Sequence, residues 1–372
     1  MRLEDCKAYE LLEKREITDL KSEGYVLRHK KTGARVCLLA NDDENKVFYI
    51  GFRTPPEDST GVAHILEHSV LCGSKEFPVK DPFVELVKGS LNTFLNAMTY
   101  PDKTLYPVAS CNDKDFQNLM HVYLDAVFYP NVCTNESIFR QEGWRYELEK
   151  PEDELTLNGV VYNEMKGAFS NPDEVAFREM QKSLFPDNTY GKVSGGDPEV
   201  IPDLSYERFL EFYGKLYHPS NSYIYLYGNM DMEEKLKYID EQYLSHFDYR
   251  EVDSCIKPQK PFEKPVRVEK TVPLNEGEDI NENTYLTANY VVGDCFDRDL
   301  YVAMQVVDYA LCSAPGAPLK QALVDRRLGK EVFSSYEDGV LQPFFSIVSK
   351  GVDAAKEQEF LDTIHEVLTD IV

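Results

Sequence analysis

The sequence predicts an α+β fold in which helices pack on a mostly antiparallel sheet. Three strands are expected early in the chain, at 25–29, 34–40 and 46–53, where apolar residues run between turn-forming residues. The segment 31–33, Lys-Thr-Gly, is typical of a hairpin turn and joins the first two strands. Apolar residues at helical spacing in 114–129 indicate a helix.

Further elements follow from helical periodicity, capping residues and apolar runs. Helices are expected at 7–14, around His64, at 81–89 with Asp81 as N-cap, and at 136–148, 206–217, 231–247, 299–312, 319–328 and from 354 onwards. Asp58, Ser59 and Thr60 offer side-chain caps for the helix around His64. Strands are expected at 223–228 and 284–292.

The stretch 91–108 has the composition of a loop followed by a strand. Pro101 and Pro107 favour the edge of a sheet, since proline cannot donate to a central ladder. An edge strand beside a cleft can bind an extended peptide through main-chain hydrogen bonds. An ordinary structural edge strand is the alternative.

At 372 residues the chain is long enough for two domains. We expect a first module at 1–250, a linker at 251–265 with prolines among charged residues, and a second module at 266–372. The second module repeats the first loosely but lacks the histidine motif described below. We therefore interpret it as non-catalytic and, from where the sequence stops, as truncated.

The formal net charge of −25 argues against nucleic acid or an anionic membrane as a partner, because both need a basic surface. The charge suits a positively charged substrate, and solubility alone is the alternative explanation. No apolar run approaches the roughly 20 residues that span a bilayer. Residues 1–10 resemble neither a secretory signal nor a transit peptide. We expect a cytoplasmic protein, or one in an organelle matrix after removal of a targeting segment.

The eight cysteines are scattered and form no Cys-x-x-Cys pair. We expect reduced, mostly buried thiols rather than a disulfide framework. Cys72 follows His68 by four residues, and helix packing explains it better than metal ligation does. The only tryptophan, Trp144, is expected in the core, and Glu142 is interpreted as surface charge.

The segment 61–74, Gly-Val-Ala-His-Ile-Leu-Glu-His-Ser-Val-Leu-Cys-Gly-Ser, contains the residues that point most directly to chemistry. On a helix, His64 and His68 lie one above the other, with Glu67 beside them. Neutral imidazole is a favoured zinc ligand, and a carboxylate beside a zinc-bound water can accept its proton. The order His-x-x-Glu-His is the inverse of the commoner zinc-protease motif.

A solvated helix face is the alternative reading of this motif, since such a pattern also arises by chance. The neighbouring residues, however, are apolar on most sides of the helix, and a mostly apolar helix is usually buried. Burying three ionisable side chains costs several kcal/mol unless they are paired or bound to a metal. Metal ligation therefore explains the cluster better.

Three segments, 61–74, 91–108 and 159–167, resemble the presequence-protease branch of the pitrilysin and insulin-degrading-enzyme superfamily, peptidase family M16. The resemblance extends less sharply over essentially the whole chain. It implies repeated modules of helices on a mostly antiparallel sheet, and one zinc ion per chain. The family's third zinc ligand is a glutamate on a helix, and Glu164 matches it, 96 residues after His68.

The resemblance also implies how a substrate would bind. In the family a strand with the pattern Asn-Ala-x-Thr holds the peptide, so Asn96, Ala97 and Thr99 are the substrate-binding candidates. Relatives have two halves that close around the peptide, and this chain resembles the first half. The implied partners are unstructured peptides and the C-terminal half of the same enzyme, which would supply an arginine and a tyrosine.

Some relatives carry a further glutamate seven residues before the third ligand, where this chain has Leu157. The sequence therefore does not say what orients the histidines. The function implied is that of a zinc endopeptidase for unfolded peptides, with His64, His68 and Glu164 as ligands and a water in the fourth position. Glu67 would take that water's proton and pass it to the leaving amine.

Three alternatives to an active peptidase remain. The chain could be a non-catalytic partner subunit of the same fold, although its motif residues are intact. Its zinc could only stabilise the module, although a structural site normally has four protein ligands. It could also be a half that is inactive without its C-terminal half.

Overall fold

The computed structural model describes residues 6–80, 82–272, 274, 277, 279 and 283–371. The chain forms two compact units, of which the first comprises Met1–Ala168 and Lys192–Cys255 and the second Phe169–Gly191 and Ile256–Val372. The sequence-based division at 251–265 placed 169–191 in the first module. The structure groups this segment with the second unit, because Leu184, Phe185 and Tyr190 pack with Val340 and Phe344 in one apolar cluster.

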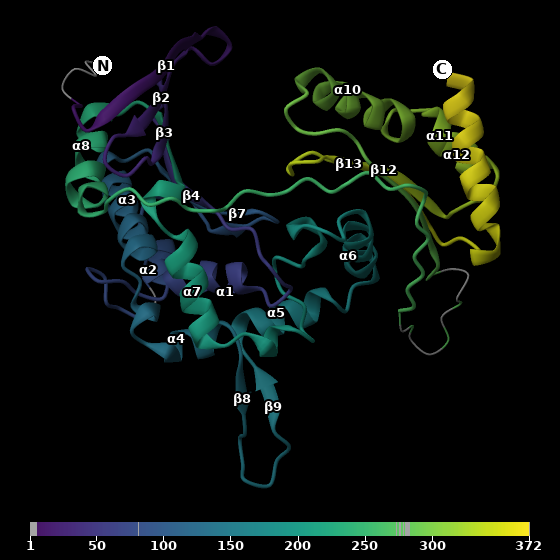
Figure 1. Cartoon of the computed structure of the whole chain (residues 1–372), viewed down its shortest axis with the longest axis horizontal. Coiled ribbons are helices and arrows are strands. Elements are labelled where there is room, and N and C mark those ends of the chain that lie inside the picture. Colours follow the sequence, from purple (N-terminus) through teal and green to yellow (C-terminus); the bar gives the residue numbers. More distant parts are fainter. Residues whose placement is uncertain are drawn as a thin grey trace. The chain divides into compact units, whose positions relative to one another are not determined.

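The first unit is built on an eight-stranded sheet in the order β1-β2-β3-β10-β4-β7-β5, with β6 also paired to β7 (Figure 1). Its strands are β1 Tyr9–Ile17, β2 Ser22–His29, β3 Arg35–Ala40, β4 Lys46–Arg53, β5 Asn92–Leu95, β6 Met98–Thr99, β7 Lys103–Ser110 and β10 Ser222–Gly228. All neighbours pair antiparallel except β10 and β3. The predicted α+β fold with a mostly antiparallel sheet is confirmed.

Seven α-helices belong to the described part of the first unit. They are α1 Val62–Val70, α2 Pro82–Gly89, α3 Asp113–Phe128, α4 Glu136–Glu142, α5 Val160–Ala168, α7 Tyr206–Leu216 and α8 Met232–Gln242. Helix α3 packs on β4 and β7 and buries Phe116, Leu119 and Tyr123 completely. A short hairpin of β8 (Arg145–Glu147) and β9 (Thr156–Asn158) projects from this unit (Figure 1).

The second unit has a three-stranded antiparallel sheet in the order β11-β13-β12. Its elements are α6 Pro172–Leu184, β11 Tyr285–Val291, α10 Arg298–Asp308, α11 Pro318–Asp325, β12 Glu331–Glu337, β13 Phe344–Lys350 and α12 Glu357–Ile371. Leu319 and Leu323 of α11, Ile347 of β13 and Phe360 of α12 are almost fully buried in one core. The unit thus has a core of its own.

Two predicted helices are wrong. Of residues 7–14, those from Tyr9 onwards belong to β1, which pairs along β2 at the edge of the sheet, where charged residues typically protect a strand. The helix expected at 136–148 ends at Glu142, and the chain then enters β8. Trp144 lies in the core as predicted and donates its indole N–H to the Leu204 carbonyl at 2.9 Å.

The side-chain caps predicted for α1 are also wrong. Gly61, with φ of +71°, is the N-cap and supplies no side-chain hydrogen bond. Asp58 instead accepts hydrogen bonds from the backbone N–H and the hydroxyl of Thr60. The N-cap predicted for α2, Asp81, lies outside the described residues.

All eight cysteines are free thiols. Cys6 and Cys312 are buried and Cys111 and Cys255 are exposed, while the other four are partly buried, so the prediction of mostly buried thiols is wrong. Among the residues that the structure describes, no helix combines the length and the apolar character that crossing a membrane requires.

Candidate active site

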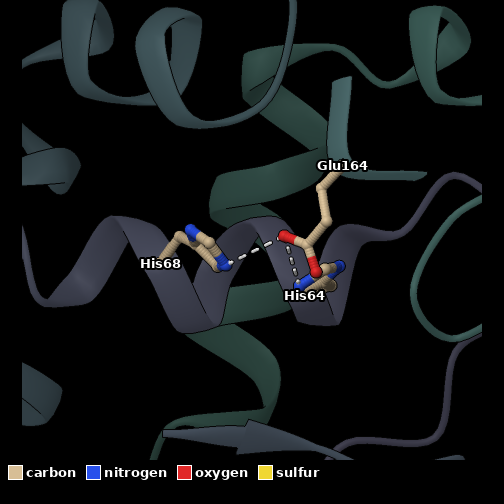
Figure 2. Close-up of side chains that lie close together, drawn as sticks. All are labelled: His64, His68 and Glu164. Atoms are coloured by element: carbon tan, nitrogen blue, oxygen red, sulfur yellow. Dashed lines mark ion pairs between the residues drawn. The ribbon is translucent and has the colours of Figure 1, made fainter. Parts of the chain in front are cut away.

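Helix α1 is held deep in the first unit by its apolar residues. Ala63, Ile65, Leu66 and Val70 have no exposed surface. The helix packs against α4, α7 and the strands β6 and β7. Since this packing fixes the rotation of the helix, one side of it is left to present His64 and His68 together (Figure 2).

The two histidines meet Glu164, which α5 contributes from far along the chain (Figure 2). The Nε2 atoms of His64 and His68 lie 3.7 and 3.8 Å from the same Oε2 atom of Glu164. The three potential ligand atoms all lie within 4.8 Å of one another. The structure therefore brings together the three residues that the sequence analysis expected as metal ligands.

The other nitrogen of each imidazole has a partner of its own. Nδ1 of His64 lies 3.0 Å from the carbonyl oxygen of Gly195, and Nδ1 of His68 lies 3.4 Å from Oε2 of Glu142. These contacts leave both Nε2 atoms facing Glu164. Such partners fix the ring orientation and the tautomer of a histidine that binds a metal.

Glu142 corrects the sequence analysis, which interpreted it as surface charge. Its side chain is buried, because it lies on the same face of α4 as the buried Phe139, three residues earlier. That spacing is the sequence pattern that could have identified it. The Gly195 carbonyl, in contrast, is a backbone group with no sequence pattern of its own.

The charges around His68 favour a cation. Burial alone lowers the pKa of His68, but the interaction with Glu142 and the negative charges of Glu67, Glu142 and Glu164 outweigh it and raise the pKa. Burial tends to raise the pKa of Glu142, and its interaction with His68 leads the contacts that lower it overall. The lowered pKa of Glu142 keeps its carboxylate ionised, and the raised pKa of His68 shows that this position favours a positive charge.

Glu67 lies on α1 between the two histidines and is only 8% exposed. It lines a cavity of about 450 Å³ together with His64, His68 and Glu164. Ala97 and Thr99 line the same cavity, as do Met98, Tyr100 and Gly195. A carboxylate and three potential metal ligands thus share one space with part of the sheet edge.

The three candidate substrate-binding residues differ in their placement. Ala97 and Thr99 line the cavity, and the Thr99 hydroxyl lies 3.5 Å from the Ala63 carbonyl of α1. Asn96 is not among the lining residues. Its backbone instead accepts a hydrogen bond from the Tyr123 hydroxyl at 3.1 Å. The Asn96 backbone is thus tied to α3, while its side chain is exposed and accepts the Ala97 N–H at 3.0 Å.

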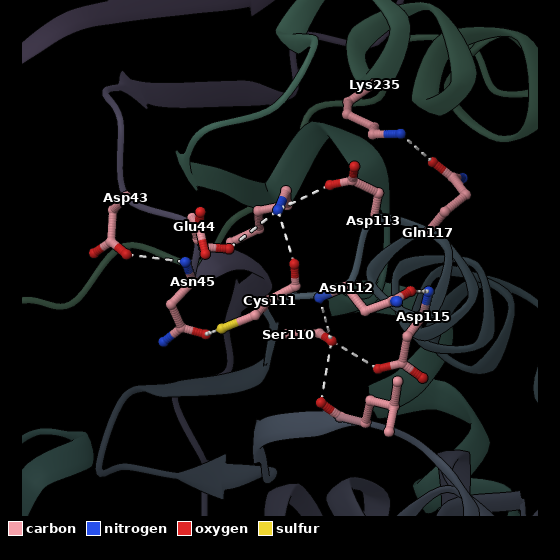
Figure 3. A network of polar contacts seen from close by, with 12 residues as sticks. Asp43, Glu44, Asn45, Ser110, Cys111, Asn112, Asp113, Asp115, Gln117 and Lys235 are labelled. Carbon is pink, nitrogen blue, oxygen red and sulfur yellow. Dashed lines mark hydrogen bonds and ion pairs between the residues drawn. The ribbon is translucent and has the colours of Figure 1, made fainter.

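A polar network fixes the other end of this sheet edge (Figure 3). The buried Lys46 donates to the Cys111 carbonyl at 3.1 Å and pairs with Asp113 at 2.8 Å. Ser110, the last residue of β7, donates its hydroxyl to the Leu91 carbonyl at 3.2 Å, just before β5. The network therefore joins β4, β7 and the approach to β5.

Two family models match the sequence. Residues 47–191 match Insulinase (Peptidase family M16), and residues 203–372 match the Peptidase M16 inactive domain. The chain belongs to peptidase family M16. His64, Glu67, His68 and Glu164 all fall within the first of these M16 regions.

Curated M16-like relatives match almost the whole chain. Protein HypA of Clostridium perfringens is 52% identical over 98% of this chain and 37% of its own length. Presequence protease 1, chloroplastic/mitochondrial, of Arabidopsis thaliana is 47% identical over 95% of this chain and 33% of its own length. These matches confirm the predicted presequence-protease-like branch. The chain spans about a third of the length of these relatives.

Solved structures show the same M16 fold. The crystal structure of pitrilysin superposes with a TM-score of 0.68 at 16% identity, covering 97% of this chain and 38% of that chain. A protease from Helicobacter pylori superposes with a TM-score of 0.67 at 16% identity, covering 93% of this chain and 80% of that chain. At such identities the likeness shows the fold alone.

Proposed function

We propose that this chain is the zinc-binding part of an endopeptidase that degrades unfolded peptides. The observation that carries the proposal is the convergence of His64, His68 and Glu164 beside the buried Glu67 in one cavity. Membership of peptidase family M16 supports a peptidase. The proposal adds three points to that membership: a bound zinc ion, a catalytic role for Glu67 and a peptide substrate.

The donor set fits zinc. Two imidazole nitrogens and one carboxylate oxygen are the protein ligands of a catalytic zinc site that keeps one position open. His64 and His68 already have Nδ1 partners, so each has Nε2 available for the ion. A structural zinc site would need a fourth protein ligand, and the described residues offer three in this cluster. When bound, zinc would supply Lewis-acid chemistry and acidify a coordinated water.

Glu67 is the group proposed to move the proton. Its carboxylate is buried in the same cavity but lies outside the ligand cluster, so it can act as a base while the ligands hold the metal. It would accept a proton from the attacking water and return it to the leaving amine. One residue would thus serve both proton transfers of peptide hydrolysis.

The substrate is proposed to bind as an added strand. Strand β6 pairs with β7 on one side, through Met98 with Leu105 and Thr99 with Thr104. Strands β5 and β6 lie at the end of the sheet, and Met98 and Thr99 of β6 line the cavity. An extended peptide could pair with this edge through its main chain, which tolerates many side chains. That mode suits unfolded peptides of varied sequence.

The partner proposed is the remaining part of the longer enzyme. The relatives named above are about three times as long as this chain, and the second family match here is described as an inactive domain. The cytoplasm, or an organelle matrix, is the proposed location. The Arabidopsis relative is named as chloroplastic/mitochondrial.

Mass spectrometry of an unstructured peptide tests the proposed function. The peptide, about as long as a targeting presequence, is incubated with the zinc-loaded chain, with a chelated sample as control. Internal cuts that disappear on chelation support the endopeptidase. If the chain binds zinc and cuts only after the C-terminal part of the enzyme is added, the partner proposal is supported. Cuts that survive complete removal of zinc would refute the proposed chemistry.

A further inference from the structure

The loop at 192–197 lies against the start of α1 and reaches His64. Within it, the Gly195 carbonyl oxygen lies 3.0 Å from His64 Nδ1. This carbonyl is the hydrogen-bond partner of that nitrogen, and it comes from a part of the chain 131 residues away. The orientation of the His64 ring therefore depends on where this loop is held.

Ser59 holds the loop on both sides of Gly195. The Ser59 hydroxyl accepts a hydrogen bond from the Val193 N–H at 3.2 Å, and its carbonyl accepts one from the Asp197 N–H at 2.8 Å. These two contacts start and end the segment that contains Gly195. Ser59 is thus attached to the loop two residues before and two residues after the carbonyl that contacts His64.

Glycines allow the loop to approach this closely. A Cβ atom on Gly61 would lie 2.8 Å from both the Gly195 carbonyl oxygen and the Gly196 Cα, which is closer than such contacts occur. Gly196 itself has a φ of +103°, which favours glycine. The close contact between the loop and the start of α1 therefore requires residues without side chains at these positions.

We propose that Ser59 is a positioning residue for metal binding, acting through Gly195 on His64. The inference rests on the proposed zinc site. By holding the Gly195 carbonyl at Nδ1, Ser59 keeps the proton on that nitrogen and leaves the Nε2 lone pair for the metal. His68 is oriented separately by Glu142, so the effect of Ser59 falls on His64 alone. Partners of this kind typically change metal affinity by about 10- to 100-fold.

The test compares Ser59→Ala with two other variants of the full chain. Ser59→Thr keeps a hydroxyl at this position and serves as the rescue. Ser220→Ala is the matched control, since the Ser220 hydroxyl also accepts a backbone N–H, from Arg250 at 3.0 Å, and is also partly buried. Circular dichroism confirms that each variant is folded.

Two readouts are measured. Zinc affinity, from competition with a chelator, is expected to fall by about tenfold in Ser59→Ala and to stay at the parent value in Ser59→Thr and Ser220→Ala. Imidazole ¹⁵N shifts of the metal-free protein at pH 8 are expected to show His64 protonated on Nδ1 in the parent, with a mixture of tautomers in Ser59→Ala alone.

Unchanged zinc affinity and an unchanged His64 tautomer in Ser59→Ala would overturn the inference while leaving the proposed zinc site intact. A parent chain that binds no zinc would overturn the proposed function and the inference about metal binding with it. The ¹⁵N shifts would then still report whether Ser59 controls the His64 tautomer. If Ser59→Ala proves unfolded, Gly61→Ala, which pushes on the Gly195 carbonyl, is expected to give the same two changes.

Discussion

At the level of single residues, the site depends on which nitrogen of each imidazole is already engaged. Gly195 and Glu142 face the two Nδ1 atoms, and both Nε2 atoms face Glu164. Helical spacing and a local motif predicted His64 and His68 as ligand candidates, and the family resemblance supplied Glu164. The sequence did not predict what orients them, because one partner is a backbone carbonyl and the other lies on a separate helix.

The role proposed for Glu67 predicts a separation of zinc binding from catalysis. Glu67→Gln removes the base and keeps the ligands, so zinc content stays at the parent level. Turnover falls by roughly 10³-fold, the scale of a general base. Hydrolysis rates of a peptide substrate and metal content, measured on the same zinc-loaded sample, check this. Full activity in the zinc-loaded variant would show that Glu67 is not the base.

The buried Glu142 predicts an effect on metal affinity from outside the ligand set. Glu142→Gln removes the charge beside His68 Nδ1, and zinc affinity falls by about 10- to 100-fold. Glu136→Gln is the matched control, since Glu136 lies on the same helix but pairs with Arg140 at its exposed surface. Chelator competition compares the two. Equal zinc affinity in both variants would show that Glu142 does not support metal binding.

At the level of elements, the edge of the sheet is the feature that connects the fold to peptide binding. Strand β6 is only two residues long, and α1 packs directly against it. The network around Lys46 and Ser110 fixes the neighbouring strands. The sequence indicated this edge through its prolines, but the fold was needed to show that Ala97 and Thr99 border the cavity.

Binding by strand addition predicts sensitivity to the substrate's backbone. A peptide with N-methyl groups at alternate amides loses its main-chain donors on one edge, so its KM rises by at least tenfold. The same peptide methylated at the other alternate amides presents its intact edge and is the control. Steady-state kinetics of both peptides measure the effect. If the two peptides and the unmodified one have equal KM values, the peptide does not bind as a strand.

The sequence predicted some of the strands poorly. Strand β1 has only one residue in the core, so its charged composition resembles that of a helix. Strands β12 and β13 were not predicted, although every residue of β13 except the last is buried. The buried helices α1 and α3 were predicted well, because packing on one face imposes a helical period on the sequence.

At the level of the whole molecule, the chain leaves and re-enters the first unit close to the site. It leaves after Ala168, four residues beyond Glu164, and returns at Lys192, three residues before Gly195. A linear reading of the sequence could not find this crossing, because the contacts of 169–191 with Val340 and Phe344 join segments far apart in the chain.

The stability of the molecule is expected to fall in acid through His218. Burial, with a contribution from Arg250, lowers the pKa of His218 to about 4, and its Nδ1 accepts the Ser220 N–H at 3.2 Å. In an unfolded chain the pKa of a histidine is about 6.5. Between this pH and about pH 4, His218 is therefore protonated in the unfolded state and neutral in the folded state. The contribution of His218 to the free energy of unfolding is therefore complete above about pH 6.5 and is lost as the pH falls towards 4.

His218→Asn keeps an acceptor for the Ser220 N–H but does not titrate. The decline in the free energy of unfolding between pH 6.5 and 4 should be smaller in this variant by on the order of 1 kcal/mol, a value discounted for the partial exposure of the ring. Urea unfolding across this range measures it. An equal decline in the parent and the variant would contradict the assignment to His218.

The zinc content of the purified chain is the measurement that bears most directly on the site. Elemental analysis of the parent after zinc loading and removal of excess metal should give one zinc ion per chain, and the same content in Glu67→Gln. His68→Ala should lose the zinc because it removes a ligand. A parent chain without zinc, or a His68→Ala variant that keeps the zinc ion with unchanged affinity, would show that His64, His68 and Glu164 do not form the metal site.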